Sequence, residues 1–194
     1  IEEGAKNMAF LRQRSNSLGL DLAATTEGFK QFSGAMIGTS LEGQATRDIF
    51  DGVNVAASVM GLGAEDAKGS FLALSQMMGK GKVSAEELRG QLGERIPGAF
   101  NIAARAMGMT TAELDKMMSE GKLIAEDFLP KFSDELKKTF GPGLDKSVNS
   151  AQANLNRFNN TMLELKLSLG RTLLPVVNSV MSAFKKGFQF LKNN

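Results

Sequence analysis

The chain has 194 residues and a formal net charge of +2, and it contains no cysteine, histidine, tryptophan or tyrosine. With 42% hydrophobic residues it can bury a core, which argues against disorder. Disulfides are excluded, and the usual ligands of zinc, copper and haem sites and the base of catalytic triads are missing. Alanine, leucine and methionine favour helices over strands, so the composition predicts an all-α fold.

Hydrophobic residues at intervals of three and four predict three helices at the start of the chain. They cover residues 2–17, 21–36 and 39–60, and the glycines expected to end them are Gly19, Gly38 and Gly61. Thr39 and Glu42 have the spacing of a capping box, in which a hydroxyl and a carboxylate bind backbone amides at the start of a helix. Alternation with a period of two is not sustained anywhere, so no strand is predicted.

The middle of the chain contains a sequence repeat with an offset of 40 residues. The residues that recur are Leu74, Met77, Met78, Gly81, Lys82, Ala85 and Glu86, with the counterparts Leu114, Met117, Met118, Gly121, Lys122, Ala125 and Glu126. Each copy reads as a helix, a turn whose glycine can adopt a positive φ, and a second helix. Two related hairpins, over residues 74–100 and 114–140, predict one compact helical domain over residues 20–140.

Capping residues set further helix boundaries in this region. Two pairs fit the capping box, Ser84 with Glu87 and Thr110 with Glu113. Pro97 suits the first turn of a helix that ends near residue 107. The second copy of the repeat has Ile124 in place of Ser84, so its second helix must be capped differently.

Gly141-Pro142-Gly143 is the strongest break in the sequence, and we place a domain boundary there. Residues 144–194 then carry apolar side chains spaced mostly by three, four or seven, which predicts long amphipathic helices. These side chains are Val148, Leu155, Phe158, Met162, Leu165 and Leu169, followed by Val176, Val177, Val180, Met181, Phe184, Phe188 and Leu191. Gly170 and Pro175 are expected to bend or interrupt the helix. The apolar stripe must pack against the preceding domain or another copy of the chain.

The C-terminal segment also carries an excess of positive charge. From Lys146 onward there are seven basic residues and one acidic residue, Glu164. A basic amphipathic helix, here residues 166–192, can contact anionic lipid or DNA, although charges that are spaced rather than clustered favour a solvated helix face. The longest apolar stretch, residues 173–184, is shorter than the roughly 20 residues that a helix needs to span a membrane.

Residues that suggest enzyme chemistry are better explained as structural. Glu86, Glu87 and Glu94 lie on one short segment, whereas paired catalytic carboxylates usually come from different elements. The glycines and lysines at residues 79–82 lack the spacing of a phosphate-binding loop. The sequence therefore predicts no enzyme, no cofactor and no metal.

The stretch from Gly79 to Met109, GKGKVSAEELRGQLGERIPGAFNIAARAMGM, resembles the signature of the tape measure domain of tailed-phage and prophage tail proteins. The resemblance covers about residues 20–185 and is sharpest over residues 79–109. The positions that we take as the candidate interaction or structural motif are Gly81, Lys82, Glu86, Glu87, Leu88, Arg89, Gln91, Leu92, Gly93, Glu94 and Pro97. Beyond this motif, the resemblance extends to Gly121-Lys122-Leu123 and Leu173-Leu174-Pro175.

The resemblance implies a structural role in tail assembly and in determining tail length. Tape measure proteins are long helical chains in the lumen of the growing tail. The implied partners are tail-tip or baseplate proteins, tail-tube proteins, further copies of the chain as a homo-oligomer, and a tail assembly chaperone. The implied location is the virion tail, and the host cytoplasm during assembly. The alternative is a segment that contacts membrane or DNA during genome ejection.

The segment is expected to be a folded module of a longer chain. The sequence begins with Ile1 rather than methionine, so residues 1–19 are interpreted as a helix that continues a longer protein. A helix rises about 1.5 Å per residue, so this segment is too short to be the ruler itself. The charged residues of the motif are either a contact surface or part of a well-capped hairpin, while Leu88, Leu92 and Ile96 face the core.

Overall fold

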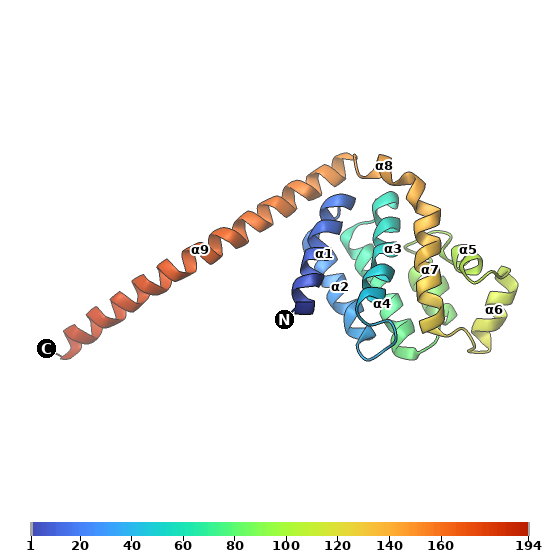
Figure 1. Cartoon of the computed structure of the whole chain (residues 1–194), viewed down its shortest axis with the longest axis horizontal. Helices are drawn as coiled ribbons and strands as arrows, with labels where there is room; N and C mark the ends of the chain where they lie inside the picture. Colours follow the sequence, from blue (N-terminus) through green and yellow to red (C-terminus); the bar gives the residue numbers. More distant parts are fainter. Residues whose placement is uncertain (1, 194) are drawn as a thin grey trace. The chain divides into compact units, whose positions relative to one another are not determined.

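The computed structural model describes the backbone of residues 2–193, and their side chains except those of 171–172, 176–178, 180 and 183–193. Every named element in this range is helical, so the predicted all-α class is confirmed (Figure 1). The elements are α1 (Glu2–Leu18), α2 (Leu22–Met36), α3 (Gln44–Met60), α4 (Ala64–Lys80), η1 (Glu86–Leu92), α5 (Ala99–Ala106), α6 (Thr111–Ser119), α7 (Ala125–Phe140), η2 (Gly141–Gly143), α8 (Leu144–Ser147) and α9 (Ala151–Asn193). η1 is a π-helix and η2 is a 3-10 helix.

The contacts divide the chain into two units. The first ends at Arg157 and contains α1 to α8 with the start of α9, and the second is the rest of α9 from Phe158 onward. In the first unit α2 packs against α4 and α3 packs against α7, while α5 contacts both α6 and α7. Figure 1 shows α1, α2, α3, α4 and α7 running alongside one another, with α5 and α6 at one side of this bundle.

Phenylalanine rings form the centre of the core of the first unit. Phe50 and Phe71 stack with their ring centroids 4.0 Å apart, and Phe29 meets Phe50 edge-on with centroids 5.0 Å apart. The rings fit because α2 has a glycine beside them, and a Cβ on Gly28 would lie 2.8 Å from the ring of Phe71. Aromatic pairs in these geometries add to the hydrophobic burial, so they fix α2, α3 and α4 against one another.

The segment between α2 and α3 corrects the predicted third helix. α3 begins only at Gln44, so the capping box predicted for Thr39 and Glu42 is wrong. The amide of Gly38 donates to the Glu42 carboxylate at 2.8 Å, and this bond holds a turn instead of a helix start. Gly43 then adopts a φ of 83° as the residue that precedes α3. A side chain is disfavoured at that φ, so a glycine rather than a hydroxyl cap sets the boundary.

Two other boundaries test the predicted caps. Thr110 and Glu113 form the predicted capping box at the start of α6, with each backbone amide donating to the side chain of the other residue at 2.8 and 3.2 Å. Pro97 lies in the turn before α5 rather than in its first turn, because α5 begins at Ala99. Gly98, with a φ of 82°, is the residue that starts this helix.

α9 continues through Gly170 and Pro175, so the predicted interruption does not occur in the described backbone. The side chains of the predicted first stripe that belong to the second unit are exposed, namely Phe158 at 62%, Met162 at 37%, Leu165 at 50% and Leu169 at 52%. Leu167, Leu173 and Leu174 in the same unit are exposed as well. Met181 is also exposed. The other residues of the predicted second stripe lie outside the described side chains, and they are Val176, Val177, Val180, Phe184, Phe188 and Leu191.

Candidate functional site

The two glycine-lysine turns of the sequence repeat lie against each other in the first unit. Lys82 and Ile124 form an antiparallel bridge. Its bonds run from the amide of Val83 to the carbonyl of Leu123 at 2.8 Å, and from the amide of Ala125 to the carbonyl of Gly81 at 3.2 Å. The turn glycines, Gly81 and Gly121, have φ values of 69° and 65°, as the sequence predicted. The bridge therefore brings the start of the motif beside the start of α7.

Glu87 is a carboxylate with no exposed surface. Lys80 Nζ donates to its Oε1, and the Ser84 hydroxyl donates to its Oε2. Burial by itself would raise the pKa of Glu87, but the hydrogen bonds from Lys80 and Ser84 outweigh burial and hold the pKa below its usual value. The ionised carboxylate therefore ties the end of α4 to η1. The capping box predicted for Ser84 and Glu87 is replaced by this direct bond between hydroxyl and carboxylate, and η1 has no side-chain cap.

The π-helix η1 supplies the apolar side of the motif. Leu88, Leu92 and Ile96 are fully buried, which confirms the expectation that they face the core. Immediately after η1, a Cβ on Gly93 would overlap the carbonyl oxygen of Arg89. π-helical turns are rare and occur often at functional sites. The close approach to the Arg89 carbonyl thus explains why the motif has glycine at residue 93, where the chain leaves η1.

Arg89 links η1 to the two helices that follow it. The guanidinium lies 3.9 Å from the ring centroid of Phe100 in α5, and Nη2 lies 2.9 Å from Asp115 Oδ1 in α6. Both members of the ion pair are about half exposed, so the pair contributes little to stability. Stacking on the ring restricts the arginine, and its charge is therefore held at one place on the surface.

The side chain of Arg95, in the turn after η1, lies against α4. A Cβ on Gly69 would overlap the Arg95 guanidinium, so this glycine leaves room for the side chain to lie close against α4. Arg95 also donates to the backbone carbonyl of Gln91. The end of η1 and the following turn are thereby fixed to the side of α4.

The motif positions fall into two groups in the structure. Those that shape the fold are Gly81, Glu87, Leu88, Leu92 and Gly93. Those whose side chains are exposed are Lys82, Glu86, Arg89, Glu94 and Pro97, and Gln91 is intermediate. Sequence reasoning missed Lys80, Phe100 and Asp115, which are the partners of Glu87 and Arg89. The need of a buried carboxylate for a cation would have indicated Lys80 if the burial of Glu87 had been predicted.

In the part of the chain that the structure describes, no cluster of acidic side chains could hold a metal ion. The described helices also include none that is long and apolar enough to cross a membrane. What the site does provide is a set of charged side chains on a rigid frame. Glu86 and Arg89 belong to a helix whose other face is anchored in the core.

Comparison with known proteins places this helical module in a family. The family model described as tape measure protein matches residues 1–171. A curated relative, the probable tape measure protein of Salmonella phage Felix O1, is 37% identical over 156 residues. This match covers 79% of the present chain but only 20% of the relative. No solved structure matches the chain.

The chain belongs to the tape measure protein family, whose members are structural components of phage tails. The predicted family is therefore confirmed. The family match begins at residue 1 rather than near residue 20, and it ends at residue 171, before Leu173-Leu174-Pro175. Neither match supports the alternative of a membrane- or DNA-contacting segment. The basic residues Lys185, Lys186 and Lys192 on which that alternative partly depended lie outside the described side chains.

Proposed function

We propose that the first unit is a folded docking module of a tape measure protein. It binds tail-tip, baseplate or tail-tube proteins while the tail assembles in the host cytoplasm, and it thereby takes part in setting the tail length. The observation that carries this proposal is the two-sided construction of the motif. Its apolar residues and Glu87 are buried, whereas Glu86, Arg89 and Glu94 are exposed around them.

Fixed charges on a rigid frame suit specific recognition. Arg89 is held by Phe100 and Asp115, and Glu86 lies 3.2 Å from the Lys80 that also binds Glu87. Side chains that are already ordered lose less conformational entropy when a partner binds. Charges at the rim of an interface act mainly on the association rate and on the choice of partner. The exposed face of η1, with Glu94 just after it, is therefore the proposed contact surface.

The second unit supports a proposal of self-association in several copies. Phe158, Met162, Leu165 and Leu169 follow one another at intervals of four, three and four residues, and all are exposed. Alternating intervals of three and four are the spacing of the a and d positions of a coiled coil. We propose that residues 158–169 pack against the same residues of further copies, so that several docking modules reach the growing tail together.

A charge reversal on the proposed contact surface tests the docking role. We expect Glu94→Lys in the full-length tape measure protein to weaken its binding to purified tail-tip proteins by tenfold or more. Asp134→Lys, which makes the same charge change at an exposed position of α7, is the matched control and should bind as the wild type does. Equal binding by both variants, or no binding by the wild-type protein to any tail protein, would reject the docking module.

A further inference from the structure

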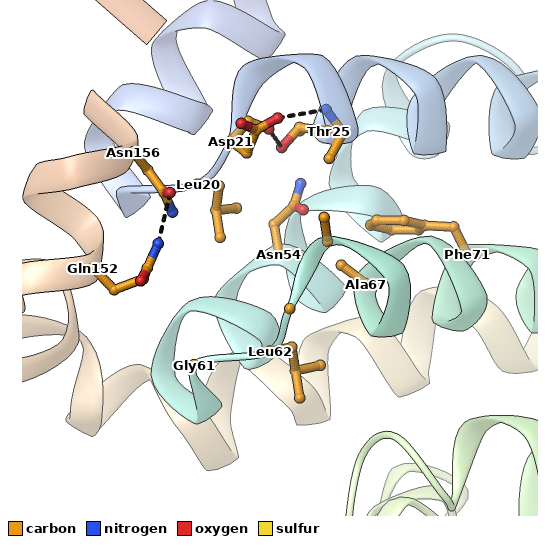
Figure 2. Close-up of a pocket in the computed structure, with 13 residues that line it drawn as sticks. Leu20, Asp21, Thr25, Asn54, Gly61, Leu62, Ala67, Phe71, Gln152 and Asn156 are labelled. Atoms are coloured by element: carbon orange, nitrogen blue, oxygen red, sulfur yellow. Dashed lines mark hydrogen bonds between the residues drawn. The ribbon is translucent and has the colours of Figure 1, made fainter. Parts of the chain in front are cut away.

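A cavity of 380 Å³ opens in the first unit between α2, α3, α4 and the first residues of α9 (Figure 2). Leu20, Leu62, Ala67 and Phe71 give it apolar walls, and polar side chains enter from three of the helices. None of the motif residues lines it. The cavity is thus a feature that the tape measure signature does not explain.

Asn54 of α3 is the polar group at the inner side of this cavity. Its side chain is only 1% exposed, and its Nδ2 has no hydrogen-bond partner among the described residues. Figure 2 shows it projecting into the space between Leu20, Thr25 and Ala67. A buried amide that donates no hydrogen bond destabilises a protein. A leucine of similar size would avoid this cost. The presence of asparagine is explained if a group that enters the cavity accepts a hydrogen bond from Asn54 Nδ2.

The start of α4 adds further donors to the same cavity. α4 has 17 residues, and its first backbone amides have no side-chain cap because residue 63 is glycine. Gly63 and Ala64 both line the cavity. The positive end of the helix and Asn54 Nδ2 both disfavour a cation there.

The carboxylate of Asp21 makes the cavity unsuitable for an anion. Asp21 lines it and uses one oxygen to accept the amide of Ala24 at 2.8 Å, which caps α2. Asp66, in the first turn of α4, does not line the cavity but adds a second negative charge to the helix end that does. The lining of the cavity therefore includes both hydrogen-bond donors and a carboxylate acceptor. A neutral group that both accepts and donates matches this arrangement, and a primary amide is such a group.

The outer wall of the cavity is fixed by two more amide side chains. Gln152 Nε2 donates to Asn156 Oδ1 at 3.0 Å, and Asn156 Nδ2 donates to the carbonyl of Gly19 at 2.8 Å. A Cβ on Gly19 would overlap Ala153, and its φ of 67° also favours glycine. The close approach and the two bonds hold this wall against the turn between α1 and α2, so the cavity is preformed.

We infer that this cavity binds the primary amide of a glutamine or asparagine side chain presented by a partner polypeptide. The amide oxygen accepts a hydrogen bond from Asn54 Nδ2, and the amide nitrogen donates to the Asp21 carboxylate. The apolar walls formed by Leu62 and Phe71 contact the aliphatic stem of the entering side chain. This inference stands independently of the docking surface on η1.

Nuclear magnetic resonance titration of the isotope-labelled chain with small probes tests this inference. The probes are N-acetyl-glutamine methylamide, the corresponding glutamate and lysine derivatives, and a norleucine derivative without a polar head. We expect the glutamine probe alone to shift the side-chain amide signal of Asn54 and the backbone signal of Ala64, with saturation in the millimolar range. Equal shifts with the charged or apolar probes, or no shift with any probe because water alone fills the cavity, would overturn the inference.

Two variants separate binding from folding. Asn54→Leu should weaken glutamine binding at least tenfold at the Ala64 signal, and it should raise Tm by about 2–4 °C because an unsatisfied donor is removed. Ala67→Leu leaves Asn54 in place but narrows the cavity, and it should weaken binding to the same degree. Asn101→Leu, at an exposed position of α5, is the control and should bind as the wild type does. Unchanged binding by the folded Asn54→Leu or Ala67→Leu variant would contradict the site.

Discussion

The two copies of the sequence repeat differ in how they treat one carboxylate. In the first copy Lys80 reaches the buried Glu87. In the second copy the counterpart of Lys80 is Glu120, whose carboxylate lies 2.6 Å from Lys122 Nζ. The counterpart of Glu87 is Asp127, which is exposed. A carboxylate is tolerated inside a protein where a cation and hydrogen bonds accompany it. The buried ionic link therefore forms in the copy that has Lys80, Ser84 and Glu87 together, whereas the other copy has Glu120, Ile124 and Asp127 at these positions.

The helices after the two turns differ as well. η1 is a π-helix that ends beside Gly93, whereas α7 is a regular α-helix with Ser133 at the corresponding position. The Ser133 hydroxyl donates to the carbonyl of Asp48 in α3 at 2.9 Å. The first copy thus turns tightly and exposes charges, while the second packs along α3. Similar sequences therefore form a short π-helix in the first copy and a 16-residue α-helix in the second, and each has one buried face.

The largest effect is expected at apolar positions that the copies share. Leu88 and its counterpart Phe128 are both fully buried. Leu88→Ala should lower the free energy of unfolding by about 2–5 kcal/mol and Phe128→Ala by about 3–5 kcal/mol, because each leaves a cavity. Denaturant unfolding followed by circular dichroism measures both. A loss near zero in either variant would show that this copy does not belong to the core.

The next effect concerns the tight exit from η1. Gly93→Ala should cost about 1–3 kcal/mol of unfolding free energy, because its Cβ would overlap the Arg89 carbonyl. Gly90→Ala is the matched control, since no atom lies within 4 Å of the Cβ that it adds. It should be neutral or stabilising by up to about 1 kcal/mol. Equal unfolding midpoints for the two variants would be incompatible with the close approach at Gly93.

Removal of the carboxylate charge should lower the free energy of unfolding much more in the first copy than in the second. Glu87→Gln should lower the unfolding free energy by about 1–3 kcal/mol, because charge-assisted bonds from Lys80 and Ser84 are lost. Asp127→Asn, the equivalent change in the second copy, should stay within about 0.5 kcal/mol of the wild type, as exposed substitutions do. Thermal and urea unfolding provide the measurement. A larger loss for Asp127→Asn would reverse the comparison.

The same link predicts a dependence on pH. The pKa of Glu87 is lowered from its ordinary value of 4.5. Its contribution to stability is therefore fully present above pH 4.5 and is lost as the pH falls through the lower folded-state pKa. The difference in unfolding free energy between the wild type and Glu87→Gln should shrink steadily below pH 4.5. A difference that stays constant from pH 7 to pH 3 would show that Glu87 is not held as a carboxylate.

The smallest effect is expected from a cap transplanted between the copies. Ile124 precedes α7 without any side-chain cap and is 44% exposed. Ile124→Ser places a hydroxyl three residues before Asp127, and it should raise the unfolding free energy by about 0.5–1 kcal/mol. Ile124→Ala removes the same apolar atoms without adding a cap, so the serine variant should be the more stable of the two. The opposite order in thermal melts would rule out capping at this position.

Sequence patterns were sufficient for the class of fold and for much of its framework. Helical periodicity and the glycines at the two turns gave all-α structure and positive φ at Gly81 and Gly121. The box of Thr110 and Glu113 forms as predicted because both side chains are exposed and free to bind the local backbone. Local signals of this kind depend on neighbouring residues alone, and they can be recognised without knowledge of the tertiary structure.

Features that depend on distant contacts were not predictable. Ser84 and Glu87 have capping-box spacing, but the buried Glu87 carboxylate binds Lys80 instead of a backbone amide. The segment that contains Glu87 is a π-helix without a side-chain cap. The resemblance gave the motif positions but not their division into buried and exposed groups. The unsatisfied Asn54 also has no sequence signature, because its environment is assembled from α2, α3, α4 and α9. Only the packing of separate elements shows these properties.

Site-specific crosslinking inside assembling phage tests the central claim most directly. A photoreactive amino acid would replace Glu94 on the proposed contact surface, and in a second strain it would replace Asp134 on α7. The docking account predicts covalent adducts with tail-tip, baseplate or tail-tube proteins from position 94 and none from position 134. The docking proposal would be contradicted by adducts from position 134 alone. It would also be contradicted if tails of normal length formed without any protein adduct from position 94.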